Sequence, residues 1–288
     1  MTLHLIEGES TVKSFENKVA AITGAGSGMG RTLALRLAAQ KCNLALSDVN
    51  EAGLAETAAL AAQSGVKVTS RKVDVADRAA VYAWADEVVQ DHGKVNLIFN
   101  NAGVALGATV EGMSYEDFEW IVGINFWGVV HGTKAFLPHL KASGEGHIIN
   151  TSSVFGLMGV PSQSAYNATK FAVRGFTEAL RQELDLGKSA VSATSVHPGG
   201  IKTNIARAAR MSKSVRDIGL DDVAGSEKFE KMFITTADSA AGTILKAVRN
   251  NKRRVLVGPD AYLIDWIVRL MPALYQRLTM AFARQSMR

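Results

Sequence analysis

A tyrosine and a lysine four residues apart are the pair best suited to chemistry in this sequence. Tyr166 and Lys170 share the segment SAYNATK, and Ser153 lies a short distance before it. On a helix, residues i and i+4 share one face, so the ammonium can lie near the phenol. A free tyrosine has a pKa of about 10, and a neighbouring cation lowers it by favouring phenolate. Such a phenol can exchange a proton with an alcohol or a ketone, provided that the chain also holds a hydride carrier.

A glycine-rich turn near the N-terminus offers a site for that carrier. The residues TGAGSGMG (23–30) follow an expected strand at Val19–Thr23 and open an expected helix that ends near Gln40. Glycines permit a tight turn and let the backbone approach a pyrophosphate at the N-terminus of a helix. The strand–turn–helix context favours nucleotide binding over a plain turn. The predicted contacts are Gly24, Ser27, Gly28, Met29 and Gly30.

Acidic residues end the next two expected strands. Asp48 ends the strand that begins at Asn43, and no Arg or Lys stands beside it in segment 46–50. Its carboxylate can accept hydrogen bonds from adenosine ribose hydroxyls and would repel a 2′-phosphate, so we expect NAD in preference to NADP. The alternative is that Asp48 only begins a turn. Asp74 and Val75 end the third strand at the same edge and could border the adenine, although Asp-Val is common at strand ends.

Strand-length apolar runs alternate with helix-length patterns along most of the chain. This alternation predicts the α/β class, with a parallel sheet covered by helices on both faces. Right-handed crossovers then give a doubly wound, Rossmann-like sheet of about seven strands. Ser114 and Asp117 resemble a capping box and open one long helix. The remaining expected strands are 66–73, 95–100, 147–151, 191–196 and 254–257, and the longer expected helices are 114–140, 165–186 and 239–250.

Composition bounds the function classes. The 288 residues carry no repeat or linker, so we expect a single dinucleotide-binding domain over 1–288. The single cysteine, Cys42, allows no intrachain disulfide, and the histidines form no ligand cluster, so we expect no metal site. The net charge is +5, with no basic run interleaved with aromatics, so a solvated surface is favoured over nucleic-acid binding. No secretory signal or spanning apolar run is recognised, which favours a cytoplasmic protein.

Six separated motifs occur in one order and resemble those of the short-chain dehydrogenase/reductase family, in its group with the TGxxxGxG turn. The resemblance covers roughly residues 17–258. Its motifs are the glycine turn, Asn100-Asn101-Ala102-Gly103, Asn125, Ser153, Tyr166-x-x-x-Lys170 and Pro198-Gly199.

The resemblance implies a role for each catalytic position. Tyr166 is the implied acid/base, and Lys170 lowers its pKa and binds the nicotinamide ribose. Ser153 would hydrogen-bond the substrate oxygen and stabilise its developing charge. Asn125 would hold a water molecule that links Lys170 to solvent as a proton relay.

The resemblance also implies further cofactor contacts and an assembly. Asn100 would line the cofactor and steady the sheet. Ile201 and Thr203 would contact the nicotinamide carboxamide. Members of the family commonly associate through their two longest helices, which implies a homodimer or homotetramer. The other implied cofactor-binding residues are Ala102, Gly103, Pro198 and Gly199.

The segments around the expected pocket are mostly apolar. Residues 154–160 contain no Arg or Lys that could grip a carboxylate, so a neutral hydrophobic secondary alcohol or ketone suits them better than a hydroxy acid. The alternative is that most of these side chains belong to the core. Residues 204–235 interrupt the regular alternation where a lid would sit, although a plain surface loop fits their polarity as well.

Residues 261–288 form a C-terminal extension with a broad apolar face, punctuated by arginines and kinked at Pro272. Such a face must be buried, either on its own subunit or on a partner subunit. The other hypothesis is peripheral membrane contact, with Trp266 and the arginines at the headgroup level. The apolar residues are Leu263, Ile264, Trp266, Ile267, Leu270, Met271, Leu274, Leu278 and Phe282.

The leading functional hypothesis is an NAD-dependent alcohol dehydrogenase or ketone reductase. The first alternative is an NADP-preferring carbonyl reductase. The second is a catalytically silent regulator that binds a nucleotide on the same fold. The presence of Ser153, Tyr166 and Lys170 together argues against the regulator, which has no need of all three.

Overall fold

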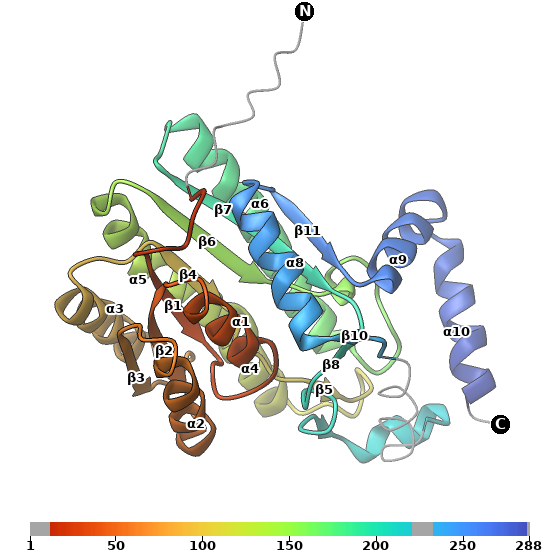
Figure 1. The fold of residues 1–288 in the computed structure, drawn as a ribbon. Coiled ribbons are helices and arrows are strands. Elements are labelled where there is room, and N and C mark those ends of the chain that lie inside the picture. The colour runs from red at the N-terminus through yellow and green to blue at the C-terminus, as the bar shows by residue number, and fades with distance from the viewer. Residues whose placement is uncertain (1–11, 221–232, 287–288) are drawn as a thin grey trace, which may run out of the picture.

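Seven parallel strands form the central sheet of the computed structural model, which describes residues 12–220 and 233–286 (Figure 1). The spatial order reverses the direction of chain progress between β1 and β4. In doubly wound sheets, ligands bind beyond the C-terminal ends of the strands at such a switch point. In spatial order the strands are β11 (Arg254–Val257), β7 (Val191–Pro198), β6 (Gly146–Thr151), β4 (Leu97–Asn100), β1 (Val19–Thr23), β2 (Asn43–Asp48) and β3 (Val68–Lys72).

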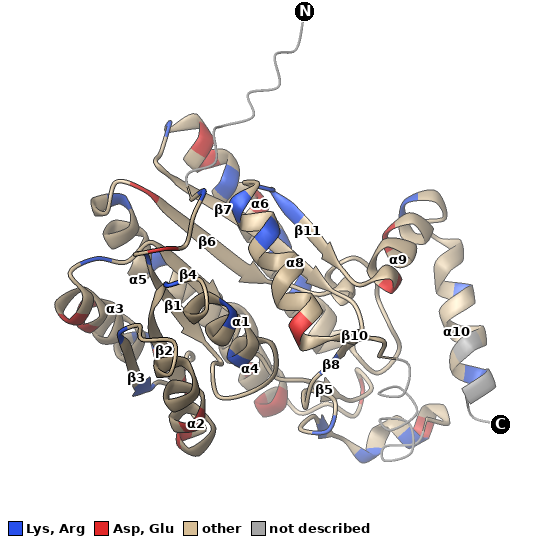
Figure 2. Cartoon of the chain, viewed as in Figure 1, with Lys and Arg blue, Asp and Glu red and all other residues tan. Residues whose placement is uncertain are grey.

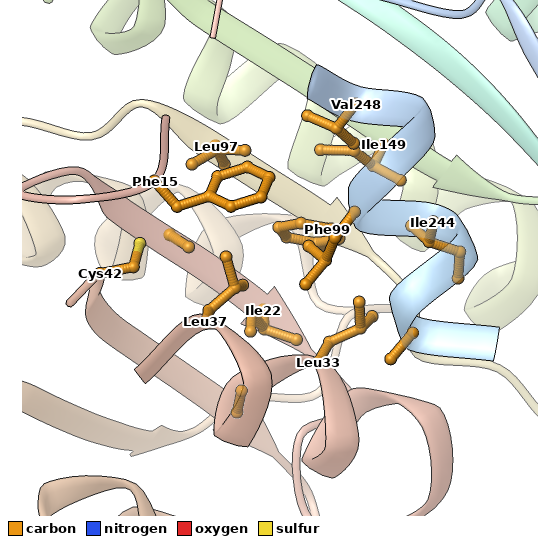
Figure 3. Packing of buried hydrophobic residues seen from close by; sticks show 14 of the residues in the cluster. Phe15, Ile22, Leu33, Leu37, Cys42, Leu97, Phe99, Ile149, Ile244 and Val248 are labelled. Carbon is orange, nitrogen blue, oxygen red and sulfur yellow. The ribbon is translucent and has the colours of Figure 1, made fainter. Parts of the chain in front are cut away.

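Helices cover both faces of this sheet, as predicted. One core contains Leu33, Leu37, Ile244 and Val248, which Figure 3 shows meeting beside Phe99 of the sheet. The helices that contribute to this core are α1 (Gly28–Ala38), α2 (Glu51–Ala62) and α8 (Ala237–Arg249). The helices that contribute to the core on the opposite face are α3 (Arg78–His92), α5 (Gly128–Ala142) and α6 (Ser164–Leu186).

The long helix predicted over 114–140 is continuous but contains a π-helical turn. α4 (Tyr115–Val122) passes through this turn, Gly123–Trp127, into α5. Ser114 Oγ accepts a hydrogen bond from the Asp117 N–H at 3.1 Å, as expected of an N-cap. The Asp117 carboxylate, however, accepts a hydrogen bond from Arg210 at 3.1 Å, so a long-range ion pair engages this residue. π-turns are frequent at functional sites, and this one carries Asn125.

Two short pairings lie outside the main sheet and were not predicted. β5 (Leu106–Gly107) pairs with β9 (Arg210–Met211), and β8 (Ile201–Lys202) pairs with β10 (Thr235–Thr236). Two-residue strands are too short to show an alternating pattern in the sequence. Residues 221–232 of the predicted lid lie outside the described residues, so the lid remains a prediction.

The C-terminal extension forms two helices because Pro272 separates them. α9 spans Pro259–Leu270 and α10 spans Leu274–Ser286. The residue before a proline is disfavoured in the α region, and Met271 accordingly has φ −131° and ψ 63°. Figure 1 shows α9 next to the end of β11 and α10 farther from the sheet. Within the described parts of the chain, no helix has the length and apolarity needed to cross a bilayer.

Candidate functional site

The structure brings the three predicted catalytic side chains together. Tyr166 and Lys170 lie in the first turns of α6, and Lys170 Nζ is 5.5 Å from the centre of the tyrosine ring. The ammonium also donates a hydrogen bond to the Thr151 carbonyl at 3.0 Å. Ser153, just beyond β6, hydrogen-bonds the Tyr166 side chain and accepts the Phe155 N–H at 3.1 Å. A hydroxyl, a phenol and an ammonium therefore converge at the C-terminal end of the sheet.

Burial dominates the electrostatics of this group. It raises the pKa of Tyr166 to about 12, against the lowering effect of the hydrogen bond to Ser153. It lowers the pKa of Lys170 to about 8. The sequence predicted a lowered phenol pKa, and the structure differs because desolvation of the phenolate outweighs a cation whose nitrogen is directed at the Thr151 carbonyl.

Asn125 faces inward from the π-turn and is held by main-chain groups. Its Oδ1 accepts the Val104 N–H at 2.8 Å, and its Nδ2 donates to the Val104 carbonyl at 2.9 Å. A methyl group built on Gly103 would lie 3.2 Å from Asn125 Oδ1 and 3.5 Å from Lys170 Nζ. The glycine therefore leaves space between these two polar atoms, as the proposed proton relay requires.

Asn100 lies inside the sheet rather than on its surface. Its Nδ2 donates to Asn150 Oδ1 at 2.8 Å and to Thr133 Oγ1 at 3.2 Å, and the residue is buried. These bonds connect β4 to β6 and α5. They agree with the predicted steadying of the sheet.

Thr23 and Asn101 join the glycine turn to the loop after β4. Thr23 Oγ1 accepts the N–H groups of Asn101 and Ala102, each at 3.0 Å. Asn101 Nδ2 donates to the Thr23 carbonyl at 3.1 Å. Gly24 has φ +67°, and a methyl there would lie 2.8 Å from Ala102 Cα. Sequence reasoning gave Thr23 and Asn101 no role, although their positions at the ends of the two switch-point strands were the available signal.

The glycine turn opens toward the segment after β7. A methyl group on Gly28, which has φ +52°, would lie 3.2 Å from Thr203 Cγ2. At Gly30 it would lie 2.0 Å from the Gly24 carbonyl oxygen, which explains the need for glycine there. Ser27 is exposed and makes no capping bond, so its hydroxyl and the first N–H groups of α1 are suited to bind phosphate.

Three predicted cofactor residues direct their side chains into the protein. Met29 packs against the first core, and Val75 and Ile201 are buried. A cofactor contact at these positions would therefore involve the backbone. Asp74 is exposed, and its Oδ1 accepts the Ala76 N–H at 2.9 Å, so this carboxylate forms a turn just beyond β3.

Asp48 faces the glycine turn, where it both begins a turn and borders a cleft. Its Oδ1 accepts the Asn50 N–H at 2.9 Å, and its Oδ2 accepts the Gly26 N–H at 2.8 Å. The adjoining cleft has a volume of about 440 Å³. Its lining residues are Gly26, Ser27, Gly28, Arg31, Asn50, Ala52, Gly53, Glu56 and Asn204.

Arg31 is the basic residue of this cleft, and sequence reasoning missed it. Its guanidinium is paired with Glu56 at 2.7 Å and donates to the Gly26 carbonyl at 2.8 Å and to Thr57 Oγ1 at 3.0 Å. Its charge is therefore compensated within the protein. This arrangement gives little attraction for an additional phosphate.

His197, near the end of β7, supports Ser153. Its Nδ1 lies 3.1 Å from the Ser153 carbonyl oxygen, and its Nε2 lies 3.0 Å from Ser195 Oγ. Burial lowers the pKa of His197 to about 4, so the ring is neutral at physiological pH. The carbonyl can only accept, which assigns the proton to Nδ1 and makes Ser195 the donor to Nε2.

The surroundings of the Tyr166 ring are partly apolar. Phe155 meets the Tyr166 ring edge to face, with centroids 5.9 Å apart. Val154, Leu157 and Met158 are buried, so for these three residues the core alternative is correct. The sequence therefore overstated how many residues of 154–160 line a pocket.

Known proteins match this chain closely. Residues 18–214 match the family model described as short chain dehydrogenase. The putative oxidoreductase SadH of Mycobacterium tuberculosis is 51% identical over 271 residues, which cover 94% of this chain and 96% of that protein. A crystal structure of a short chain dehydrogenase/reductase from Burkholderia phymatum in complex with NAD is 32% identical, with a TM-score of 0.83, and the match covers 92% of this chain and 97% of that one. An alcohol dehydrogenase from the archaeon Thermococcus sibiricus, complexed with 5-hydroxy-NADP, is 26% identical, with a TM-score of 0.68 and coverage of 83% and 95%.

Proposed function

The chain belongs to the short-chain dehydrogenase/reductase family, and from this premise we propose that it is an NAD-dependent oxidoreductase that interconverts a hydrophobic secondary alcohol and its ketone. The observation that carries the proposal is the convergence of Ser153, Tyr166 and Lys170 at the C-terminal end of the sheet, where Lys170 Nζ approaches the loop after β4 that Thr23 joins to the glycine turn. NAD, when bound, accepts or supplies the hydride. The residues of the chain bind and orient the reactants and move the proton.

Tyr166 carries the proton in this proposal. In oxidation its phenolate oxygen takes the alcohol proton, and in reduction its phenol returns a proton to the ketone oxygen. Ser153 donates a hydrogen bond to the same substrate oxygen, and its backbone is held in place by His197. Lys170 stabilises the phenolate, and the space beside Gly103 gives the proton a route past Asn125.

The substrate proposal is supported by the apolar surroundings of the phenol. Phe155 packs against the Tyr166 ring, and Tyr166 also packs against the buried cluster of Leu106, Ile121 and Ala165. The nearby Arg210 stacks on Trp120 and pairs with Asp117, so its charge is already engaged. A panel of secondary alcohols of rising size, assayed with NAD, tests this proposal. Turnover of hydroxy acids in preference to neutral alcohols would contradict it.

NAD is the proposed cofactor because the Asp48 carboxylate faces the glycine turn beside the cleft where a 2′-phosphate would have to lie, and the Arg31 guanidinium of that cleft is already paired with Glu56. Wild-type enzyme is expected to prefer NAD over NADP by about 10²-fold or more in kcat/KM, since juxtaposed like charges cost several kcal/mol. Asp48→Ser removes both the acceptor for the ribose hydroxyls and the charge that repels a 2′-phosphate. Activity with NAD should therefore fall, and the ratio of kcat/KM for NAD to that for NADP should decrease. Initial rates with both cofactors measure the ratio.

Glu51→Gln is the matched control, since it removes a neighbouring carboxylate that pairs with Lys72 outside the cleft. This variant should retain the wild-type cofactor ratio. A wild-type preference for NADP would favour the NADP-dependent carbonyl reductase and would remove the role assigned to Asp48. Cofactor binding without turnover of any alcohol or ketone would favour the nucleotide-binding regulator.

A homo-oligomer formed through the long helices is the proposed assembly. Phe118 of α4, Trp127 of the π-turn and Phe171 of α6 are exposed, although they are large and aromatic. Aromatic residues are enriched in protein interfaces. Their location supports the arrangement that the family resemblance implies.

Peripheral contact with an anionic membrane is a second proposal, carried by the C-terminal helices. Leu263, Trp266 and Leu270 of α9 are 62%, 64% and 69% exposed, and they continue into the exposed Leu274 and Leu278 of α10. The exposed charges that accompany this surface are arginines, and α10 contains no acidic residue (Figure 2). An apolar ridge with basic neighbours complements an anionic bilayer surface. We place the enzyme in the cytoplasm, with this ridge as its membrane contact.

Flotation tests this contact with the full chain. Wild-type protein should float with vesicles of phosphatidylcholine and phosphatidylserine and should float less with phosphatidylcholine alone. The triple variant Leu263→Gln, Trp266→Gln, Leu270→Gln should remain in the dense fraction, because it removes the exposed apolar residues. Val110→Gln, at an exposed apolar residue elsewhere, is the control and should still float.

The competing occupant of the ridge is a second copy of the chain. If the wild type fails to float, and the triple variant instead lowers the oligomeric state in sedimentation velocity, the ridge is a subunit interface. The membrane proposal would then be wrong.

A further inference from the structure

We propose that the two C-terminal helices position the two loops of the active site. Asp260 of α9 positions the loop at Pro198–Gly200, which leads to the predicted nicotinamide contacts. Tyr275 of α10 positions the loop that follows Ser153. This inference rests on the proposed function and extends it to a segment beyond the part of the chain that the family resemblance covers.

Asp260 accepts a main-chain hydrogen bond from the nicotinamide loop. The Gly200 N–H donates to Asp260 Oδ2 at 2.6 Å. A methyl group on Gly199 would lie 2.1 Å from the same oxygen, and one on Gly258, which has φ +99°, would lie 2.5 Å from Oδ1. The backbone therefore follows the carboxylate closely on both sides, and glycine is required at each position.

The burial of one oxygen of Asp260 lowers the stability of the fold, so packing alone does not explain why a carboxylate occupies this position. Asp260 lies in the first turn of α9, where the helix dipole favours an anion. Its Oδ1, however, is buried without a hydrogen-bond partner among the described residues. A buried oxygen without a partner destabilises the fold. The presence of Asp260 is therefore better explained by its hydrogen bond to the loop at Pro198–Gly200 than by a contribution to the stability of the fold.

Gly200 leads directly into β8 and the proposed cofactor contacts. Ile201 begins this strand, and Thr203 approaches the glycine turn at Gly28. A shift of the Gly200 amide therefore moves the segment proposed to face the nicotinamide. The adenosine half of the cofactor, next to Asp48, is bound by other elements.

Tyr275 of α10 supports the other loop of the site, the one that follows Ser153. Its Oη accepts the Gly159 N–H at 3.2 Å. The same loop is held from α6 by Asn167, whose Nδ2 donates to the carbonyls of Phe155 and Met158 at 2.8 and 2.7 Å. Phe155 in turn packs on the Tyr166 ring. Tyr275 therefore completes the support of a loop that borders the substrate.

Loss of the Asp260 contact and loss of the Tyr275 contact should change different measured quantities. Asp260→Ala should weaken NAD binding about tenfold, because it removes a charged hydrogen-bond acceptor. The affinity for ADP-ribose, which lacks the nicotinamide, should stay at the wild-type value, whereas a general folding defect would weaken both ligands. Asp260→Asn keeps an acceptor oxygen and should recover most of the NAD affinity. Isothermal titration calorimetry with NAD and with ADP-ribose gives the dissociation constants for the wild type, Asp260→Ala and Asp260→Asn.

Tyr275→Phe should raise the KM for cyclohexanol about two- to tenfold, since it removes a single neutral hydrogen bond. The dissociation constant for NAD should not change. Tyr262→Phe, at an exposed tyrosine of α9, is the matched control and should behave as wild type.

The outcomes separate this inference from the proposed function. If wild-type protein does not bind NAD, or binds it without oxidising any secondary alcohol, the proposed function fails. If wild type binds NAD and Asp260→Ala binds it equally well, or loses NAD and ADP-ribose in parallel, the role of Asp260 is overturned. An unchanged KM in Tyr275→Phe, in an enzyme that oxidises cyclohexanol, overturns the role of α10.

Discussion

Replacement of Tyr166 by phenylalanine is expected to lower turnover by about 10²–10⁴-fold, the range that a positioned acid or base contributes. The ring remains, so its packing against Phe155 is kept and only the proton-carrying oxygen is lost. The dissociation constant for NAD should stay at the wild-type value. Initial rates of cyclohexanol oxidation and cyclohexanone reduction, together with an NAD titration, measure both quantities.

Tyr115→Phe is the control for this experiment, because Tyr115 is a fully solvated tyrosine, 87% exposed. It should keep wild-type activity. A Tyr166→Phe enzyme with nearly full turnover would show that another group moves the proton, and the assigned acid/base would be wrong.

Replacement of Lys170 by methionine is expected to damage turnover and cofactor binding together. An opposite charge a few ångströms away lowers the pKa of an acid by about 1–3 units, so its loss should slow oxidation at neutral pH by about 10–10³-fold. NAD affinity should also fall, because the same ammonium is proposed to bind the nicotinamide ribose. Single-turnover rates and NAD titration separate the two losses.

The pH profile of the same variant gives an independent measure. Oxidation needs the phenolate, so its rate rises with pH, whereas reduction needs the protonated phenol and falls. Removal of a cation raises the pKa of the phenol, so both limbs of Lys170→Met should move to higher pH. Lys170→Arg keeps the cation and should retain the wild-type position of these limbs. Intact NAD affinity in the methionine variant would contradict the ribose-binding role.

Much of the fold follows from local patterns in the chain. The alternation of apolar runs with helical periods predicted a parallel sheet of about seven strands with helices on both faces, and Ser114 capped its helix where expected. The structure differs from the sequence prediction where a sequence pattern is too short to recognise or where tertiary packing changes the local conformation. The π-turn at Gly123–Trp127 has ordinary helical periodicity on either side, and the two-residue strands carry no period to recognise.

The glycines of the site show which features could be predicted from the sequence and which could not. The turn at 24–30 was recognised from its spacing after a strand, because its conformation is local. The requirement at Gly199, by contrast, comes from a carboxylate at position 260, which no local motif connects to it. The pairing of Arg31 with Glu56, which bears on the choice of cofactor, likewise joins two different helices.

The sequence by itself determined the chemical groups and their approximate placement, because residue type, i,i+4 spacing and strand–turn–helix order are properties of neighbouring residues. Only the tertiary structure decided the energetics of those groups. The pKa of Tyr166 depends on how thoroughly the folded chain excludes water from the phenol, and this burial outweighed the lysine that spacing had placed beside it. The same holds for the neutral state of His197 and for the supports of the two loops, because these depend on distances between residues far apart in the chain.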